Sequence, residues 1–180
     1  VLVHGDDFVA VAEREAIREF KEQLEARFEV KTKIIGHGGG EECTEARILN
    51  RIIRATVDGW EYEPDQRHAE LVIEQMGMRD ARPVATPGED ERRWEEEDNK
   101  KELESQRAKI IRAVAARCNY LAQDRPDIMY STKELCRKMA KPGVGSWKKA
   151  KRIARYLRQV PRTVLRYDWQ SDEEDLEGYS

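Results

Sequence analysis

The chain has 180 residues, of which 39% are hydrophobic and 38% are charged, and its formal net charge is -3. This length accommodates one ordinary domain or two small ones, and the high charged fraction indicates a large polar surface or extensive partner contacts. Three cysteines without Cys-x-x-Cys spacing give no support to a disulfide framework or a zinc site, and no signal peptide or membrane-spanning stretch is present.

The first predicted element is a β-hairpin over residues 1–11. Val, Leu and Phe flank a centre formed by Gly5, Asp6 and Asp7, a pattern typical of a tight turn between two half-buried strands. Two adjacent carboxylates repel each other unless a positive group lies beside them. Mg²⁺ and Mn²⁺ prefer carboxylate oxygens, so Asp6 and Asp7 are candidate metal ligands and catalytic residues for two-metal phosphoryl transfer. The alternative is a solvent-exposed turn without a catalytic role.

An amphipathic helix is predicted next, over residues 13–28. Its apolar side chains recur at three-to-four spacing and predict a stripe that packs on a sheet; they are Ile17, Phe20, Leu24 and Phe28. Residues 29–35 then indicate a strand. The His-Gly-Gly-Gly run at residues 37–40 resembles an esterase oxyanion loop, but no Gly-x-Ser-x-Gly turn exists in the sequence. We therefore reject a hydrolase and expect a flexible surface loop there.

A second hairpin is predicted in the following segment. Residues 47–54 indicate one strand, Asp58 and Gly59 a turn, and residues 60–64 the return strand, which carries Trp60 and Tyr62. These two aromatic side chains are expected at least to pack across the strands. Asp65 then caps a helix that Gly77 closes.

The second half of the chain is predicted to be mainly helical. An extended linker at residues 79–87 leads into an acidic run, which has nine acids against four bases between residues 89 and 104. This run is expected to be solvated and to separate two modules. Helices are predicted over residues 105–121, from Pro126 onward and from Ser146 onward. Their apolar faces are assigned to the core, including a Met and Cys stripe that contains Met129, Cys136 and Met139.

The last predicted helix, residues 146–159, has a strongly basic face. Between residues 133 and 166 there are twelve bases against one acid, Glu134. The helix itself carries no acid that could pair with its bases, which are Lys148, Lys149, Lys151, Arg152, Arg155 and Arg158. Such a face is tolerated when phosphates neutralise it, so these six residues are nucleic-acid-binding candidates. The alternative is a solvated surface without a partner.

Several landmarks carry a resemblance to a known family. They are the hydrophobic-x-x-Asp-Asp box, Ala85-Thr86-Pro87, Tyr120-Leu121 followed by Arg125-Pro126-Asp127-Ile128, and the segment from Trp147 to Tyr156-Leu157. The box is similar to the catalytic box of reverse transcriptases. The order and spacing of all the landmarks resemble the copia-type retrotransposon polyprotein from Val1 to Tyr167. The Arg-Pro-Asp-Ile segment and the downstream helix are the more specific part of the match.

The resemblance implies a domain organisation and roles for the residues. Residues 1–87 would be a palm remnant, 88–104 an acidic linker, 105–168 a helical thumb or connection region, and 169–180 a linker toward ribonuclease H. Trp60 and Tyr62 become primer-grip candidates. In the intact parent enzyme two Mg²⁺ or Mn²⁺ ions would support attack of a primer 3′-hydroxyl on a deoxynucleotide. His4 and Gly5 depart from the family pattern, which places primer contact and activity in question.

The fold class expected is α+β, a partial palm with antiparallel hairpins followed by a mainly helical region. The chain begins without Met and inside a strand pattern, so we expect a fragment that is inactive alone and exposes apolar surface. Its partners would be an RNA or DNA template-primer, deoxynucleotides, and the fingers, palm and ribonuclease H segments of one polyprotein, with no membrane. The expected location is intracellular, in the cytoplasm, in retrotransposon particles or in the nucleus.

Two other functions are compatible with the sequence. The first is a non-catalytic nucleic-acid-binding module that uses the basic helix at residues 146–159, in which Asp6 and Asp7 are merely structural. The second is an unrelated α+β interaction protein. Metal binding at Asp6 and Asp7 distinguishes the polymerase hypothesis from the binding module. Affinity for nucleic acid distinguishes both from the interaction protein.

Overall fold

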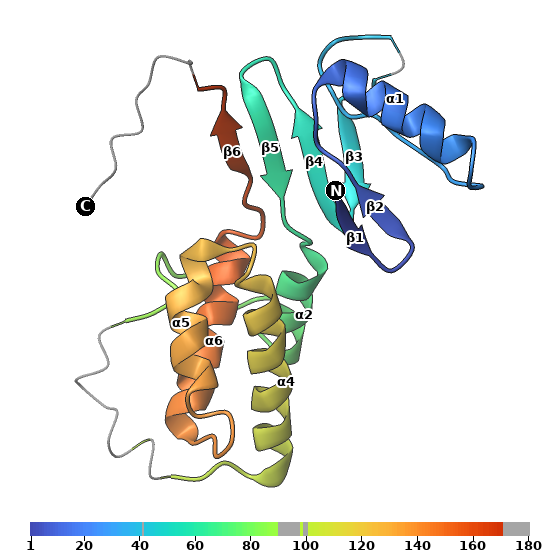
Figure 1. Cartoon of the computed structure of the whole chain (residues 1–180). Helices are drawn as coiled ribbons and strands as arrows, with labels where there is room; N and C mark the ends of the chain where they lie inside the picture. Colours follow the sequence, from blue (N-terminus) through green and yellow to red (C-terminus); the bar gives the residue numbers. More distant parts are fainter. Residues whose placement is uncertain (41, 90–97, 99–100, 171–180) are drawn as a thin grey trace, which may run out of the picture. The chain divides into compact units, whose positions relative to one another are not determined.

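The computed structural model describes residues 1–40, 42–89, 98 and 101–170. The chain has the predicted α+β composition, with helices and antiparallel strands (Figure 1). It divides into two units. The strand unit contains Val1–Ile48, Ile53–Glu61 and the described residues from Arg166, and the helical unit contains Leu49–Ile52 and Tyr62–Leu165.

A two-stranded hairpin and one helix form the first part of the strand unit. Strands β1 (Leu2–His4) and β2 (Asp7–Val9) pair antiparallel, and helix α1 spans Arg14–Glu25. The predicted apolar stripe of α1 is only half-buried at Ile17, Phe20 and Leu24. The helix also ends before Phe28, whose side chain is 60% exposed. The helix therefore forms as predicted, but its apolar face contributes less burial than expected.

The glycine-rich loop after α1 is held by one acidic side chain. The side chain of Glu42 is 3% exposed and accepts contacts from Arg14 at 3.0 Å and Arg18 at 3.4 Å, both on α1. The backbone N–H of Gly38 donates to the same carboxylate at 2.9 Å. Two guanidinium groups and an amide compensate the burial of this charge. The loop is thus anchored to the helix by a residue to which the sequence analysis gave no role.

The second sheet has the strand order β3-β4-β5-β6. Its strands are β3 (Glu45–Ile48), β4 (Arg51–Ala55), β5 (Gly59–Glu63) and β6 (Leu165–Asp168). The predicted turn is present between β4 and β5, but it spans residues 56–58, and Gly59 is the first residue of β5. Gly59 is required there because a Cβ atom would lie 2.0 Å from the carbonyl oxygen of Tyr167. A glycine at this position allows the close approach of β5 and β6.

The single strand predicted over residues 47–54 is in fact a hairpin. Leu49 and Asn50 have positive φ angles of 47° and 66°, and they reverse the chain between β3 and β4. A connection of two residues joins only antiparallel strands, and positive φ at both positions is the conformation of a type I′ turn. Asn adopts this conformation readily, whereas Leu rarely does. The Ile-rich pattern concealed a turn that Asn50 alone indicated.

Two further strand assignments were wrong. Of residues 29–35, only Ile35 forms a bridge, with Cys43, and the rest have no regular secondary structure. Alternation of residue types cannot form a strand where a pairing neighbour is missing. Conversely, β6 lies within the predicted helical region and pairs with β5. Its sequence, Leu-Arg-Tyr-Asp, has only a weak β signal, and the tertiary partner makes it a strand.

Among the described residues of the helical unit, four helices form its packed core. They are α2 (Arg67–Gln75), α4 (Ser105–Leu121), α5 (Pro126–Cys136) and α6 (Val144–Gln159). Helix α2 packs against both α4 and α6. It therefore belongs to the helical unit, although the sequence-based division placed it with the N-terminal hairpins.

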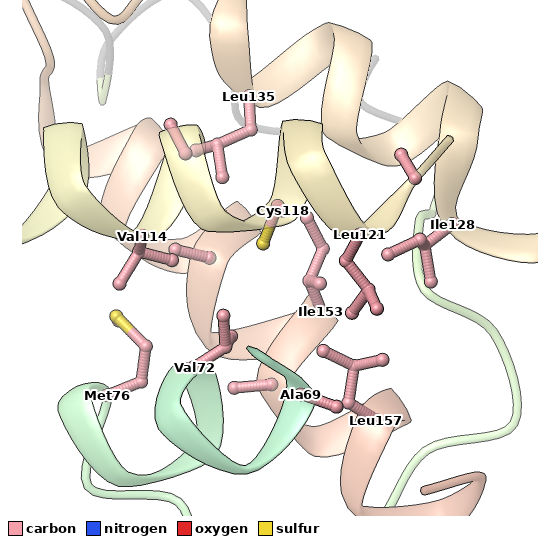
Figure 2. Close-up of a cluster of buried hydrophobic side chains, with 14 of the residues drawn as sticks. Ala69, Val72, Met76, Val114, Cys118, Leu121, Ile128, Leu135, Ile153 and Leu157 are labelled. Carbon is pink, nitrogen blue, oxygen red and sulfur yellow. The ribbon is translucent and has the colours of Figure 1, made fainter. Parts of the chain in front are cut away.

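The core of this unit consists of the predicted helical faces (Figure 2). Side chains exposed by 2% or less come from all four helices; they include Val72, Ile111, Val114, Cys118, Leu121, Ile128, Leu135, Ile153 and Leu157. Burial of each such aliphatic side chain contributes about 1.5–3 kcal/mol relative to exposure. Two members of the predicted Met and Cys stripe are not in the core, because Met129 and Met139 are 53% and 36% exposed.

The ends of the helices follow predicted signals. The N-cap residue of α2 is Gln66, one position after the predicted Asp65, but Asp65 Oδ1 accepts the N–H of Arg67, the first residue of the helix, at 3.0 Å. Gly77, with a φ of 65°, closes that helix, and Pro126 occupies the first turn of α5. None of the helices in the part of the chain that the structure describes has the length and apolar character that crossing a membrane requires.

Candidate functional site

The two predicted catalytic acids lie at the turn of the β1–β2 hairpin. The last paired residues are His4 and Asp7, so Gly5 and Asp6 form a two-residue turn. Gly5 has a φ of 59°, the left-handed conformation that such a turn requires. Asp6 and Asp7 are both exposed. The hairpin therefore presents two adjacent carboxylates to solvent on a short, defined turn.

The metal-binding capacity of this turn is limited by the number of its ligands. Carboxylate oxygens suit Mg²⁺ and Mn²⁺. Among the described residues, however, no group of three or more His, Cys, Asp or Glu side chains could hold an ion. Asp6 and Asp7 thus have suitable chemistry but do not complete a site. A further ligand from another polypeptide segment is needed for tight binding.

The aromatic residues of the second hairpin make two separate contacts. Trp60 and Tyr62 are two positions apart on β5. The ring of Trp60 meets that of Trp169 edge-to-face at 6.2 Å, and the Trp169 indole N–H donates to the carbonyl oxygen of Val57 at 3.1 Å. Trp60 is therefore a packing partner of the segment after β6. Trp60 thus has a packing role, as expected, but its ring partner is Trp169, which lies outside the β4–β5 hairpin. Its primer-grip role stays a prediction.

Tyr62 belongs to a polar cluster centred on Asp124, which the sequence analysis did not identify. The Tyr62 hydroxyl donates to Asp124 Oδ1 at 2.5 Å. Arg51 donates to Oδ2 through Nε at 2.9 Å and through Nη2 at 2.8 Å. The Arg51 guanidinium also lies 5.8 Å from the centre of the Tyr120 ring. Residues that are distant in sequence meet here, so no local sequence motif could have revealed the cluster.

The electrostatics of this cluster favour one protonation state. Burial, together with the hydrogen bond to Asp124, raises the pKa of Tyr62 to about 12. The hydrogen bond from Arg51 to Asp124 raises the pKa of the guanidinium further above its ordinary value. At neutral pH the cluster is therefore a neutral phenol and a guanidinium that both bind one carboxylate. Such a fully paired arrangement stabilises structure rather than supplying a reactive base.

A second polar network joins two of the sequence landmarks. Arg125 is 2% exposed and donates to both oxygens of Asp127, at 2.9 and 2.6 Å. It also donates to the carbonyl oxygen of Val160 at 3.0 Å, and the Tyr156 hydroxyl donates to Asp127 at 2.9 Å. Burial alone would raise the pKa of Asp127, but the hydrogen bonds and charge of Arg125 hold it below the usual value. These landmark residues thus hold α5 to α6.

The six bases of α6 lie on the side of the helix away from its buried face. Ala150, Ile153, Ala154 and Leu157 form that buried face. The bases fill the complementary arc at helical spacing. The helix contains no acid, as its sequence shows, but some of its bases form ion pairs with acids outside the helix. Lys148 binds Asp98, and Arg152 binds Glu89 at 2.6 Å.

Three of these bases hold a single stretch of chain, residues 81–89, called the covering segment below. Arg158 donates to the carbonyl oxygen of Ala81, and Arg155 Nε donates to that of Arg82 at 2.6 Å. Arg152 Nη2 donates to the hydroxyl of Thr86 at 2.9 Å. The predicted acidic linker therefore begins on the basic face of α6. Its residues 90–97, 99 and 100 lie outside the described residues.

No protein-family model, no curated protein and no solved structure matches this chain. Function must therefore be inferred from its residues and their contacts. Two sequence landmarks contact side chains of α6 in the structure: Thr86 accepts a hydrogen bond from Arg152, and Asp127 accepts one from Tyr156. Asp6 and Asp7 lie at the exposed β1–β2 turn.

Proposed function

We propose that this chain is the C-terminal part of the polymerase region of a copia-type reverse transcriptase. The observation that carries the proposal is a pair of adjacent carboxylates, Asp6 and Asp7, at the two-residue turn of the β1–β2 hairpin. Gly5 has positive φ at this turn. The order of the landmarks along the chain supports it. On this proposal the strands from β1 to β5 derive from a palm, and helices α4, α5 and α6 derive from a thumb or connection region.

The proposed parent reaction is nucleotide addition to a primer. The primer 3′-hydroxyl attacks the α-phosphorus of a deoxynucleotide, and pyrophosphate leaves. Divalent ions, when bound, supply the electrostatic stabilisation of the phosphoryl transfer. Asp6 and Asp7 would hold such ions together with a third acid from a strand outside this chain. Because the described residues do not complete that ligand set, we expect the chain alone to bind metal weakly and to be inactive.

Metal titration tests this proposal without relying on activity. Mn²⁺ broadens the NMR signals of nuclei near its site, so we expect selective broadening at the β1–β2 turn at millimolar concentrations. The double variant Asp6→Asn/Asp7→Asn should lose this broadening. A matched control, Asp58→Asn/Asp80→Asn, removes two exposed acids elsewhere and should retain it. Identical titrations of the wild type and the Asp6/Asp7 variant would contradict the polymerase proposal.

A second candidate function is nucleic-acid binding by α6 without catalysis. The arc of six bases opposite the buried face of the helix favours it, because phosphates neutralise such an arc. The contact would be independent of sequence and weakened by salt. This function stands even when Asp6 and Asp7 have no catalytic role.

Charge reversal tests the second function. The triple variant Lys148→Glu/Lys149→Glu/Lys151→Glu should weaken duplex binding, and it should reduce the dependence of log affinity on log salt by about 0.9 for each phosphate that the helix no longer neutralises. The control Lys109→Glu/Lys133→Glu/Lys138→Glu makes the same charge change at exposed positions on α4, on α5 and after α5. Equal losses of affinity in both variants would indicate a net-charge effect only. No affinity for any nucleic acid at low salt would leave an unrelated interaction protein.

A further inference from the structure

The basic face of α6 is already engaged by the protein itself. Three consecutive turns of the helix contribute one arginine each to the covering segment, through Arg152, Arg155 and Arg158. Two of the acceptors are backbone carbonyl oxygens, and the third is a threonine hydroxyl. Arginine side chains are the type of donor that would bind successive phosphates of a nucleic-acid backbone. The covering segment thus occupies a row of anion-binding groups.

Arg152 shows how complete this engagement is. Its side chain is only 24% exposed, with Nη1 bound to Glu89 and Nη2 bound to Thr86. Its Nε atom is buried without a hydrogen-bond partner among the described residues. The guanidinium therefore has no free edge for a phosphate while the covering segment is in place. A phosphate can reach this side chain only after Glu89 and Thr86 move away.

The covering segment is also seated by close packing. A Cβ atom on Gly88 would lie 2.8 Å from the hydroxyl oxygen of Ser131 on α5. The Thr86 hydroxyl donates to the carbonyl oxygen of Gly88 at 2.9 Å, which orients it to accept from Arg152. Pro83 and Pro87 restrict the backbone on both sides of Thr86, which lowers the entropy lost on ordering the segment. The covering segment is therefore held in place by local packing and hydrogen bonding as well as by the arginines of α6.

The charges at its C-terminal end complement those of the helix. Glu89 binds Arg152, and Asp98 binds Lys148 one turn closer to the start of α6. Both contacts are at least partly exposed to solvent, since the Glu89 and Lys148 side chains are 45% and 50% exposed. Exposed ion pairs are weak individually and are screened by salt. The acidic contacts can therefore be exchanged for phosphates at modest cost.

We propose that the covering segment, with Glu89 and Asp98, is an intramolecular competitor for the nucleic-acid phosphates that α6 binds. The proposal rests on the nucleic-acid-binding function of α6 argued above. In the absence of nucleic acid the segment neutralises the basic face. A polyanion displaces it, because many phosphates in a row replace two carboxylates and three neutral acceptors. Binding then requires a local rearrangement and is weaker than the charge of α6 alone would give.

Removal of the two competing charges tests the proposal in the full chain. With a fluorescent duplex of about 20 base pairs, the variant Glu89→Gln/Asp98→Asn should bind about threefold to tenfold more tightly than wild type at low salt, because two exposed ion pairs are removed. The control Asp58→Asn/Glu70→Gln removes the same number of charges from exposed positions outside residues 81–98. The gain in duplex affinity of this control should be clearly smaller than that of the Glu89/Asp98 variant. Equal affinities of the two variants, with wild type also binding, would overturn the competition while leaving the binding function intact.

Amide hydrogen exchange provides a second, independent readout. On addition of the duplex, amides within residues 81–89 should exchange faster, because the segment leaves α6. The helical core should show no such change. Unchanged or slower exchange in residues 81–89 with duplex bound would overturn the proposal. Absence of duplex binding by wild type and by the Glu89/Asp98 variant would instead refute the nucleic-acid function on which it depends.

Discussion

The β1–β2 hairpin and the helical unit differ in how far they bury apolar side chains of similar type. Leu2, Val3 and Phe8 on the hairpin are 52–59% exposed, whereas Leu135 and Leu157 in the helices are fully buried. Apolar burial is the main source of folding stability. Among the described residues, the helical unit therefore supplies most of the apolar stabilisation, while the acids proposed for catalysis lie on a hairpin that contributes little of it. Substitutions in the two regions should separate stability from function.

The largest effect is expected at the buried arginine of the helical unit. Arg125→Ala removes a buried guanidinium that donates to Asp127 and to the carbonyl oxygen of Val160. Hydrogen bonds of charged groups contribute about 1.5–3 kcal/mol each, so we expect a loss of about 3–5 kcal/mol. Urea denaturation would measure the loss in free energy of unfolding. The exposed Arg79, which pairs with exposed Glu74, provides a control, and Arg79→Ala should change stability by less than about 0.5 kcal/mol. Similar small losses at both positions would mean that the Arg125 network is not structural.

A direct comparison of the two regions comes next. Leu135→Ala should lower the free energy of unfolding by about 2–5 kcal/mol, because it leaves a cavity among α4, α5 and α6. Phe8→Ala on β2 removes a larger side chain, yet its effect should stay within about 0.5 kcal/mol, since Phe8 is half-exposed. Urea denaturation of both variants would measure these values. A large loss for Phe8→Ala would show that the hairpin is part of the cooperative core.

The two regions also differ in how well their secondary structure could be predicted from the sequence. In α4 the face of Ala108, Ile111, Val114, Cys118 and Leu121 was predicted correctly because a long helix repeats its signal over several turns. Short strands carry little periodic information. The run at residues 47–54 therefore concealed the turn at Leu49 and Asn50, and β6 was missed because only its pairing with β5 defines it.

The candidate site shows the same limit in another form. Adjacent acids at a hairpin turn, and bases on one helical face, are local patterns, and both could be placed from the sequence. Asp124 and the covering segment could not, because their partners lie far away in the chain. Arg51 is 73 positions from Asp124, and Arg155 is 73 positions from Arg82. Such contacts depend on tertiary packing and leave no spacing motif in one sequence.

A smaller effect is expected at the Asp124 cluster. Tyr62→Phe removes a hydrogen bond to a carboxylate, and hydrogen bonds to charged groups contribute about 1.5–3 kcal/mol when buried. The site is only partly buried, so we expect a loss of about 1–2 kcal/mol. Tyr130→Phe is the control, because the Tyr130 side chain is 72% exposed. If Tyr62→Phe lowers the free energy of unfolding no more than the control does, the hydrogen bond to Asp124 does not stabilise the fold.

The same substitution gives a spectroscopic test. The pKa of Tyr62 is raised from 10.0 to about 12, so its contribution to stability is present below pH 10 and is lost as the pH rises toward 12. The difference in ultraviolet absorbance between wild type and Tyr62→Phe should therefore show a phenol that ionises near pH 12. Ionisation of Tyr62 near its ordinary pKa of 10.0 would contradict the hydrogen-bonded geometry.

The smallest effect should come from acid titration of Asp127. Its pKa lies below the ordinary value of 3.8, because Arg125 outweighs the effect of burial. Its charge therefore stabilises the fold above about pH 4, and this contribution is lost as the pH falls through the lowered pKa. The difference in unfolding free energy between wild type and Asp127→Asn should thus narrow below that pH. Leu135→Ala changes no titrating group, so the difference in unfolding free energy between this variant and wild type should not narrow below about pH 4. A constant difference for Asp127→Asn across that range would show that the Asp127 carboxylate has no preferential interaction with Arg125 in the folded state.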